Sequence, residues 1–326
     1  MSNVRMLTPK VQGAMDYPQA EAFDDMQFDI RWGHREIEMQ KDLHDLKNNL
    51  TEAELHGVTT VLKLFTLYEV HVGNDYWLDC VRKMFPRPEI QSMASTFGNT
   101  ELYTHAKFYA KLNDVMGLQT DEFYQSYVED ETLKNRMSWI GRQFKVDDPL
   151  LVTAMGSITE GAILYSNFAF LKHFQAEGKN KLINMTAGIN YSVRDENLHS
   201  LAGAWLFKTL VEEMQPDKKR MDKVITKIRN TCAQIFEHES RIIDMIFEKG
   251  SIKGITDLQM KNFVKARLNL CLEQLGLEEL YIIDYDPISK WFYKNINAGT
   301  FHDFFAKLGT NYTRDWVEAR FGWNKN

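Results

Sequence analysis

Apolar residues recur every three to four positions over four long stretches of the chain, which is the pattern of helices with one buried face. The first stretch begins at a capping box, in which Thr51 is followed three residues later by Glu54. The second runs from about residue 89 to 116, the third follows Pro149, and the fourth covers about 181–211. The same periodicity predicts further helices over about 120–144, 217–247 and 257–279.

The third stretch, LLVTAMGSITEGAILYSNFAFLKHF, is apolar on nearly every side. A helix of this kind is buried on all faces, so we expect it at the centre of the fold. The chain has no strong strand-like alternation, no internal repeat and no low-complexity linker. The pattern predicts an all-α protein with a polar N-terminal arm over 1–45, a helical domain over 46–285 and an aromatic C-terminal tail over 286–326.

Composition and charge narrow the class of protein. The chain has 326 residues, 44% of them hydrophobic and 26% charged, with a net charge of -6 and no basic cluster, so no nucleic-acid partner is expected. Three widely spaced cysteines favour neither a disulfide framework nor a thiolate metal site. No apolar run reaches membrane-spanning length and the N-terminus lacks the apolar core of a signal peptide, so we expect a cytoplasmic protein without a membrane partner.

Carboxylates interrupt the apolar faces of all four predicted long helices. The interruptions are Glu69, the pair Glu101 and His105, Glu160, and the pair Glu196 and His199. A lone ionised carboxylate in such a position costs several kcal/mol unless it finds a partner. Two divalent metal ions would balance the four glutamate charges. Two helices with one Glu each and two with a Glu and a His one turn apart are the ligand set of ferritin-like di-metal carboxylate bundles.

Each of these residues also has an ordinary explanation. A single Glu-x-x-His pair, such as Glu196 and His199, occurs often by chance, and Glu69 alone fits a helix surface. Glu101 and His105 are four residues apart instead of three, which still places them only about 40° apart on a helix. The order Glu, Glu/His, Glu, Glu/His on successive helices favours the di-metal hypothesis over four separate coincidences.

Over roughly residues 30–315 the sequence resembles the small, radical-generating subunit of class I ribonucleotide reductase. The segment SVRDENLHS at 192–200 is similar to the family's Arg-Asp-Glu-x-x-His motif, and ITEGAILYSNFAF at 158–170 is similar to its Glu-Gly helix. LTEAELHGVTTVLKLFTLYE and TELYTHAKFY supply the first two ligand segments. The family usually has Asp where this chain has Glu69, and its first Glu/His pair is usually three residues apart. A one-residue helix bulge would reconcile the second difference.

The resemblance implies roles for four further residues. Tyr109, four residues after His105, matches the tyrosine that is oxidised to a stable radical. We expect Leu164 and Phe168 to line its pocket, and Ser192 is a more polar residue than such a pocket would normally contain. Asp195 matches the acid that hydrogen-bonds the first ligand histidine, and it would belong to the radical-transfer path. Trp32 and Tyr312 match aromatic residues of the path that carries the radical to the large subunit. Without the resemblance, each aromatic would be an ordinary packing residue.

The resemblance therefore implies a homodimeric oxidoreductase subunit that generates an oxidising equivalent at a di-metal site. It would pass this equivalent to a large catalytic subunit that reduces ribonucleotides to deoxyribonucleotides. Two alternatives stay open: a di-metal oxidase or oxygenase acting directly on an apolar substrate, and a metal-storage protein. Glu and His ligands suit two irons, the first expectation, and equally two manganese ions or one of each.

Overall fold

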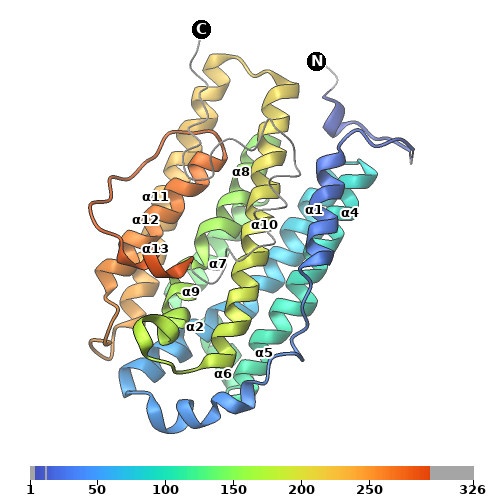
Figure 1. The fold of residues 1–326 in the computed structure, drawn as a ribbon. Helices are drawn as coiled ribbons and strands as arrows, with labels where there is room; N and C mark the ends of the chain where they lie inside the picture. Colours follow the sequence, from blue (N-terminus) through green and yellow to red (C-terminus); the bar gives the residue numbers. More distant parts are fainter. Residues whose placement is uncertain (1–3, 12, 294–326) are drawn as a thin grey trace.

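Four long helical segments, each predicted from the hydrophobic pattern, run side by side through the molecule (Figure 1). In the computed structural model, which describes residues 4–11 and 13–293, π-helical turns interrupt three of them. We call the four segments the first to fourth core helices. They consist, in order, of α2 (Glu52–His71), η4 (Val72–Val81) and α3 (Arg82–Met84); α4 (Pro88–Asn99), η5 (Thr100–His105) and α5 (Ala106–Val115); α8 (Pro149–Ile158), η6 (Thr159–Ile163) and α9 (Tyr165–Lys172); and α10 (Ile183–Met214).

The ends of these helices follow local sequence signals. Thr51 and Glu54 form the predicted capping box, with both reciprocal hydrogen bonds present. Pro88 and Pro149 occupy first-turn positions of α4 and α8, where the missing N–H costs nothing. The helix expected over about 257–279 is α12, and it ends earlier, at Gln274, because Gly276 adopts a φ of 77° that terminates the helix.

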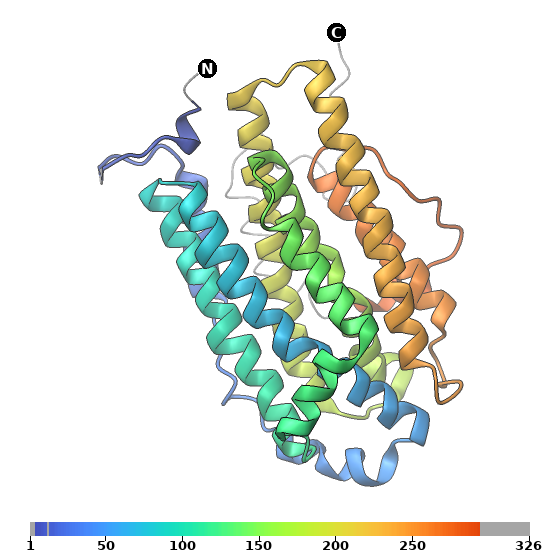
Figure 2. The ribbon, with the colours of Figure 1, turned by 180° about the vertical axis from the view of Figure 1, so that it is seen from behind.

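The third core helix lies at the centre, as its composition predicted. Every described side chain from Leu150 to Phe174 is buried. The fourth core helix packs along it through α8, η6 and α9, and α12 covers α9 and η6 from the outer side. Figure 2 shows the reverse face, where the first and second core helices, blue to teal, lie next to each other. The centre of the bundle is therefore enclosed by helices on all sides.

The N-terminal segment, expected as a polar arm, contains a helix that the sequence pattern did not predict. This helix, α1 (Pro18–Asp29), packs against α4 and α10. It buries Phe23 and Met26, and it also buries the polar side chain of Gln27. Trp32, just beyond its end, is only 4% exposed. The segment thus contributes to the core next to the second and fourth core helices.

The remaining helices complete the bundle. They are α6 (Asp121–Glu129), α7 (Glu131–Gln143), α11 (Lys218–Ile246), α12 (Asp257–Gln274) and α13 (Pro287–Phe292), with the short turns η1 (Arg5–Leu7), η2 (Met39–Asp42), η3 (Asp45–Asn49) and η7 (His173–Gly178). Residues 4–11 and 13–293 contain no β-strand, only an isolated bridge between Ile252 and Ile255. Within the same ranges, no helix has the length and apolar character needed to cross a bilayer. The predicted all-α architecture is confirmed.

Candidate metal centre

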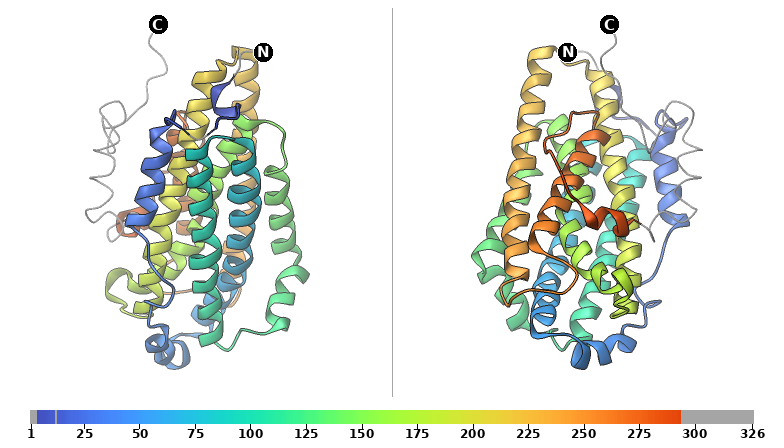
Figure 3. Two further views of the ribbon diagram at one scale, coloured as in Figure 1. Left: turned by 90° about the vertical axis from the view of Figure 1, so that its right-hand side faces the viewer. Right: turned by 60° about the vertical axis from the view of Figure 1, so that its left-hand side comes forward.

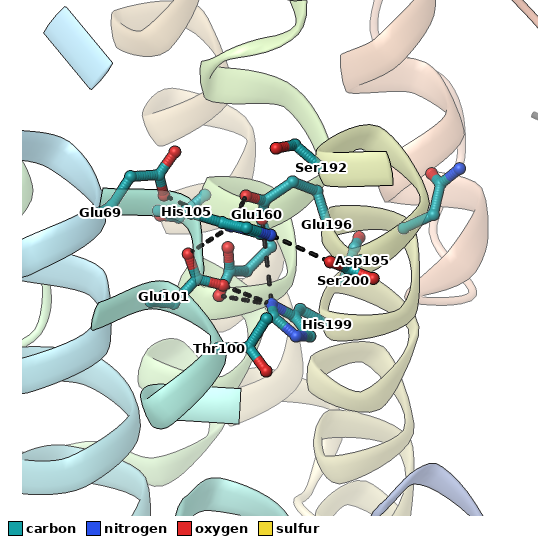
Figure 4. A network of polar contacts seen from close by, with 12 residues as sticks. Glu69, Thr100, Glu101, His105, Glu160, Ser192, Asp195, Glu196, His199 and Ser200 are labelled. Carbon is teal, nitrogen blue, oxygen red and sulfur yellow. Dashed lines mark hydrogen bonds and ion pairs between the residues drawn. The ribbon is translucent and has the colours of Figure 1, made fainter. Parts of the chain in front are cut away.

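The structure brings all six predicted ligand residues together in the middle of the four core helices (Figure 4). Their side chains are buried, and their potential ligand atoms form two overlapping groups in which all atoms lie within 4.8 Å of one another. The first group is Glu69, Glu101, His105 and Glu196, and the second is Glu101, Glu160, Glu196 and His199. Glu101 and Glu196 belong to both groups. Each of them could therefore contribute to either of two ions.

Irregular helix geometry positions several of these side chains. Glu101 and His105 lie in the π-helical turn η5, so the one-residue bulge expected from their spacing is confirmed. Glu160 lies in a second π turn, η6, and Glu69 is three residues before the long π segment η4. The fourth core helix is regular, and there the ordinary spacing of three residues places Glu196 and His199 on one face. Since π turns are rare and concentrate at functional sites, their presence on three of the four core helices points to this centre.

The two nitrogens of His105 face different groups. Nδ1 lies 2.9 Å from Glu101 Oε2, 3.3 Å from Glu196 Oε1 and 3.9 Å from Glu69 Oε2. Nε2 lies 3.0 Å from Asp195 Oδ2. With a metal ion on the glutamate side, Nδ1 would be its ligand and Nε2–H would donate to Asp195, because an ionised carboxylate only accepts.

His199 is arranged in the same way. Its Nδ1 lies 2.7 Å from Glu101 Oε1 and 3.8 Å from Glu160 Oε1. Its Nε2 lies 3.0 Å from the amide oxygen of Gln27, a residue of α1. Gln27 therefore offers an acceptor oxygen to Nε2 of His199, as Asp195 does to Nε2 of His105. This role could not be predicted, because α1 itself was not predicted and a glutamine carries no metal-ligand signature.

The protein's own charges do not balance at this site. Burial raises the pKa values of Glu69 and Glu160 well above the usual range, and the neighbouring carboxylate of Glu196 raises both further. Burial and the charge of Glu101 raise the pKa of Glu196 to about 7. Burial also acts on Glu101, but His105 and His199 outweigh it and lower the pKa of Glu101. With all four glutamates ionised, the site would hold more negative charge than its two histidines can neutralise, so without metal the carboxylates with raised pKa values keep their protons.

The donor set fits two divalent ions of the iron and manganese type. Both carboxylate oxygens of Glu69 and of Glu196, together with one of Glu101 and one of Glu160, are buried and make no hydrogen bond of good geometry among the described residues. Two of them, Glu101 Oε1 and Glu196 Oε1, instead face a histidine Nδ1. Buried polar atoms of this kind normally have a partner. Carboxylate and imidazole ligands suit several first-row metals, and two divalent ions would neutralise the four glutamates.

Asp195 also connects the site to Trp32. The indole Nε1–H of Trp32 donates to Asp195 Oδ2 over 2.7 Å, and this is the oxygen that faces His105 Nε2. Trp32 is buried, and its ring centroid lies 6.0 Å from that of His105. The structure therefore places two of the predicted path residues in one hydrogen-bonded chain that ends at a candidate ligand.

Tyr109 is fully buried beside this cluster. Its ring stacks on Phe65 with centroids 4.2 Å apart and 9° between the planes, and Phe168 stacks in turn on Phe65. Its hydroxyl donates to Ser192 Oγ over 3.2 Å, so Ser192 is the polar neighbour noted in the sequence. Burial, and secondly the charge of Glu69, raise the pKa of Tyr109 well above its usual range. The phenol is kept neutral in a dry, aromatic pocket.

Sequence reasoning missed Trp77. Its indole nitrogen donates to Glu160 Oε1 over 2.5 Å, and its ring meets the ring of His199 edge to face at 5.8 Å. On a regular α-helix a residue eight positions after Glu69 lies about 80° away from it, so the spacing carried no signal for Trp77. Tyr312, with the other aromatic residues of the tail (Trp316, Phe321 and Trp323), lies outside the described residues.

Comparisons with known proteins agree with this arrangement. A family model described as "Ribonucleotide reductase, small chain" matches residues 11–287. The chain is 26% identical to a probable ribonucleoside-diphosphate reductase small subunit of Invertebrate iridescent virus 3, over 94% of this chain and 85% of the relative. It is also 26% identical to the ribonucleoside-diphosphate reductase subunit beta of Halalkalibacterium halodurans, over 87% of this chain and 82% of the relative.

Solved structures show the same fold. A putative class I ribonucleotide reductase from Bacillus halodurans superposes with a TM-score of 0.76 at 22% identity, covering 85% of this chain and 99% of the other. The dimanganese(II)-NrdF of Streptococcus sanguinis superposes with a TM-score of 0.77 at 19% identity, covering 89% and 100%. Since the family model spans most of the sequence, this chain belongs to the ribonucleotide reductase small chain family, the di-metal carboxylate oxidoreductase subunits that generate a radical and relay it for ribonucleotide reduction.

Proposed function

We propose that Glu69, Glu101, His105, Glu160, Glu196 and His199 bind two divalent metal ions in this chain. The two overlapping ligand groups and their buried carboxylate oxygens that lack a hydrogen bond of good geometry support this assignment. His105 and His199 would each hold one ion through Nδ1, and Glu101 and Glu196, which belong to both groups, could contribute to either ion. Asp195 and Gln27 hold the histidine rings by accepting from Nε2–H.

We expect iron at both positions, with two manganese ions or one of each as the alternatives. Carboxylate and imidazole ligands bind all three combinations, and the similar Streptococcus sanguinis structure is described as dimanganese(II). Bound metal would supply the oxidising equivalent by reacting with an oxygen species. The protein supplies the ligands, excludes water, and holds the proton of Tyr109 next to Ser192 Oγ.

Tyr109 is the proposed site of the stored radical. Its pocket is apolar apart from Ser192, and its complete burial keeps external reductants away from the ring. Oxidation of a neutral phenol releases a proton. The groups near enough to take part are Ser192, which accepts the hydroxyl hydrogen bond, and Glu69, whose charge acts on the phenol.

The single observation that carries the reductase function is the shared oxygen of Asp195. Hydrogen bonds from both Trp32 and His105 converge on it and join the metal site to an indole ring. A metal store or an oxygenase that acts in its own pocket would not need this connection. We propose that the path continues through Tyr312 to a large subunit and that the chain works as a homodimer. The cytoplasmic location expected from the sequence stays a prediction.

The test is reconstitution of the metal-free chain with iron(II), manganese(II) or both, in air. Metal content, size in solution and reduction of ribonucleoside diphosphates with the large subunit are then measured. We expect two ions per chain, a dimer, and turnover that depends on both subunits. Direct oxidation of an apolar substrate without a large subunit, or a shell-forming oligomer that stores many ions, would establish one of the alternatives instead.

A further inference from the structure

A fully buried arginine lies outside the metal ligands and has no acidic partner. Arg267, on α12, is 0% exposed, and among residues 4–11 and 13–293 no carboxylate lies within 4.0 Å of its guanidinium. Its guanidinium carbon lies 3.7 Å from the ring centroid of Tyr165. Burying a cation without a counter-charge costs free energy. The groups that Arg267 contacts are therefore the place to look for its role.

Two of its hydrogen bonds go to residues that directly follow candidate metal ligands. Nε donates to the backbone oxygen of Gly161 over 2.8 Å, and Nη2 donates to Asn197 Oδ1 over 3.3 Å. Gly161 follows Glu160 in the π turn η6, and Asn197 follows Glu196 on α10. The hydroxyl of Tyr165 donates to the same Asn197 oxygen over 2.8 Å. One planar side chain therefore ties together the third and fourth core helices at the level of two ligands.

The packing at Gly161 makes this contact possible. A Cβ atom at this position would lie 2.5 Å from Cys271 Sγ and 2.4 Å from Ser200 Oγ. Cys271 is on α12, one turn after Arg267, and Ser200 is on α10. The absence of a side chain at Gly161 thus lets α12 approach the π turn closely enough for Arg267 to reach its backbone.

The third hydrogen bond of Arg267 goes to the end of the described chain. Nη1 donates to the hydroxyl oxygen of Tyr293 over 2.9 Å. Tyr293 directly follows α13, which lies against α12 and α9 (Figure 3). The ring of Phe292 packs on Phe263 at 4.8 Å, and the ammonium of Lys172 lies 4.8 Å from the Phe292 centroid. Arg267 is therefore shared between the metal-site helices and α13.

We propose that Arg267 is a positioning residue that fixes Glu160 relative to Glu196 and couples the metal site to α13 through Tyr293. This inference rests on the proposed function in that the cluster must bind metal. Glu160 and Glu196 both belong to the group that contains His199. Of these two glutamates, only Glu196 also belongs to the group that contains His105. Loss of the paired hydrogen bonds from the Arg267 guanidinium to Gly161 and Asn197 therefore weakens binding of the ion on the His199 side more than binding of the ion on the His105 side. Coupling is reciprocal, so metal binding also stabilises α13.

The first experiment is titration of the metal-free chain with Mn²⁺, followed by electron paramagnetic resonance of the free ion. We expect two ions on the unmodified chain. Arg267→Met should keep one and bind the other at least tenfold more weakly, and Arg267→Lys, which keeps the charge but not the paired hydrogen bonds, should also weaken it. Wild-type affinities in both folded variants would overturn the positioning role. Failure of the unmodified chain to bind two ions would instead refute the proposed function.

The second experiment keeps the proposal testable even if Arg267→Met does not fold. Tyr293→Phe removes one hydroxyl, and Tyr281→Phe is the matched control, since its hydroxyl donates to the backbone of Cys232 and not to Arg267. Hydrogen exchange of the α13 amides is measured with and without Mn²⁺. We expect Mn²⁺ to slow this exchange in the unmodified chain and in Tyr281→Phe, and to have little effect in Tyr293→Phe. If Mn²⁺ does not change the hydrogen-exchange rate of the α13 amides in an unmodified chain that binds two ions, the proposed coupling is wrong.

Discussion

His105 Nε2 lies 3.0 Å from Asp195 Oδ2, on the side of the imidazole ring opposite the nitrogen that faces the glutamates. The same oxygen accepts the indole hydrogen of Trp32. One carboxylate thus fixes the tautomer of a candidate ligand and links it to a redox-active side chain. This relationship could be proposed from the sequence only through the family resemblance, because Trp32 and Asp195 are 163 residues apart.

Asp195→Asn should separate these two roles from metal binding. An amide oxygen still accepts a hydrogen bond, but the negative charge that stabilises the protonated Nε2 is lost. We expect metal to remain bound, with turnover with the large subunit lowered by about 10- to 100-fold. Asp24→Asn is the control, because Asp24 is a similarly buried acid that accepts from Ser92. Unchanged turnover in Asp195→Asn would contradict the proposed path.

Glu160→Gln should lower the metal content well below two ions per chain. The amide keeps the shape of the side chain but removes a ligand charge from the centre. Glu239→Gln is the matched control, since Glu239 is equally buried but paired with Arg136 at 2.9 Å, outside the cluster. It should lower the melting temperature and leave the metal content unchanged. Elemental analysis that finds two ions in Glu160→Gln would rule out this residue as a ligand.

Metal binding should release protons at neutral pH. The pKa of Glu196 is raised to about 7, and those of Glu69 and Glu160 are raised further by burial and like charge. The stabilising effect of a protonated Glu196 is complete below its unfolded pKa and is lost as pH rises through about 7. The metal-free fold therefore becomes relatively less stable over this window, and bound metal compensates for the loss.

Calorimetric titration in two buffers of different ionisation enthalpy measures this release. We expect more than one proton per chain at pH 6, and a larger metal-induced rise in melting temperature at pH 8 than at pH 6. The difference between loaded and metal-free chains removes the contributions of groups away from the site. If no protons are released at pH 6, the four glutamates are ionised without metal and the electrostatic account is wrong.

The tail after residue 293 should carry the docking element for the large subunit. It concentrates Tyr312, Trp316 and Trp323 near the chain end. Deletion after Thr310 should keep metal and lower affinity for the large subunit by about tenfold or more, because aromatic anchors dominate such interfaces. Deletion of only residues 324–326 is the control, and Tyr312→Phe should bind normally but not turn over. A truncated chain with unchanged affinity would mean that docking occurs elsewhere.

Periodicity and caps were sufficient to predict the core helices. The capping box at Thr51 and the apolar stretch after Pro149 are strong local signals, and both match the structure. One π turn was also expected, because a one-residue bulge would reconcile the four-residue spacing of Glu101 and His105 with the three-residue spacing usual in the family. By contrast, α1 has few apolar residues and buries polar ones such as Gln27, so its pattern does not distinguish it from a solvent-exposed arm.

The parts of the site that could not be predicted depend on contacts between distant segments. No sequence motif marks Trp77, Gln27 or Arg267. Each acquires its role through hydrogen bonds to a residue on another helix. Phe65, which stacks directly on Tyr109, was likewise not among the residues expected to line its pocket. Such neighbours depend on helix rotation and depth, which a single sequence does not specify.

The most direct measurement is the electron paramagnetic resonance spectrum of the chain after aerobic reconstitution with iron(II), recorded beside that of Tyr109→Phe at equal metal content. The variant keeps the ring that stacks on Phe65 and loses only the hydroxyl bonded to Ser192. We expect a tyrosyl radical signal in the unmodified chain, no such signal in the variant, and two ions in both. The same tyrosyl signal in Tyr109→Phe, or turnover equal to that of the unmodified chain, would contradict it.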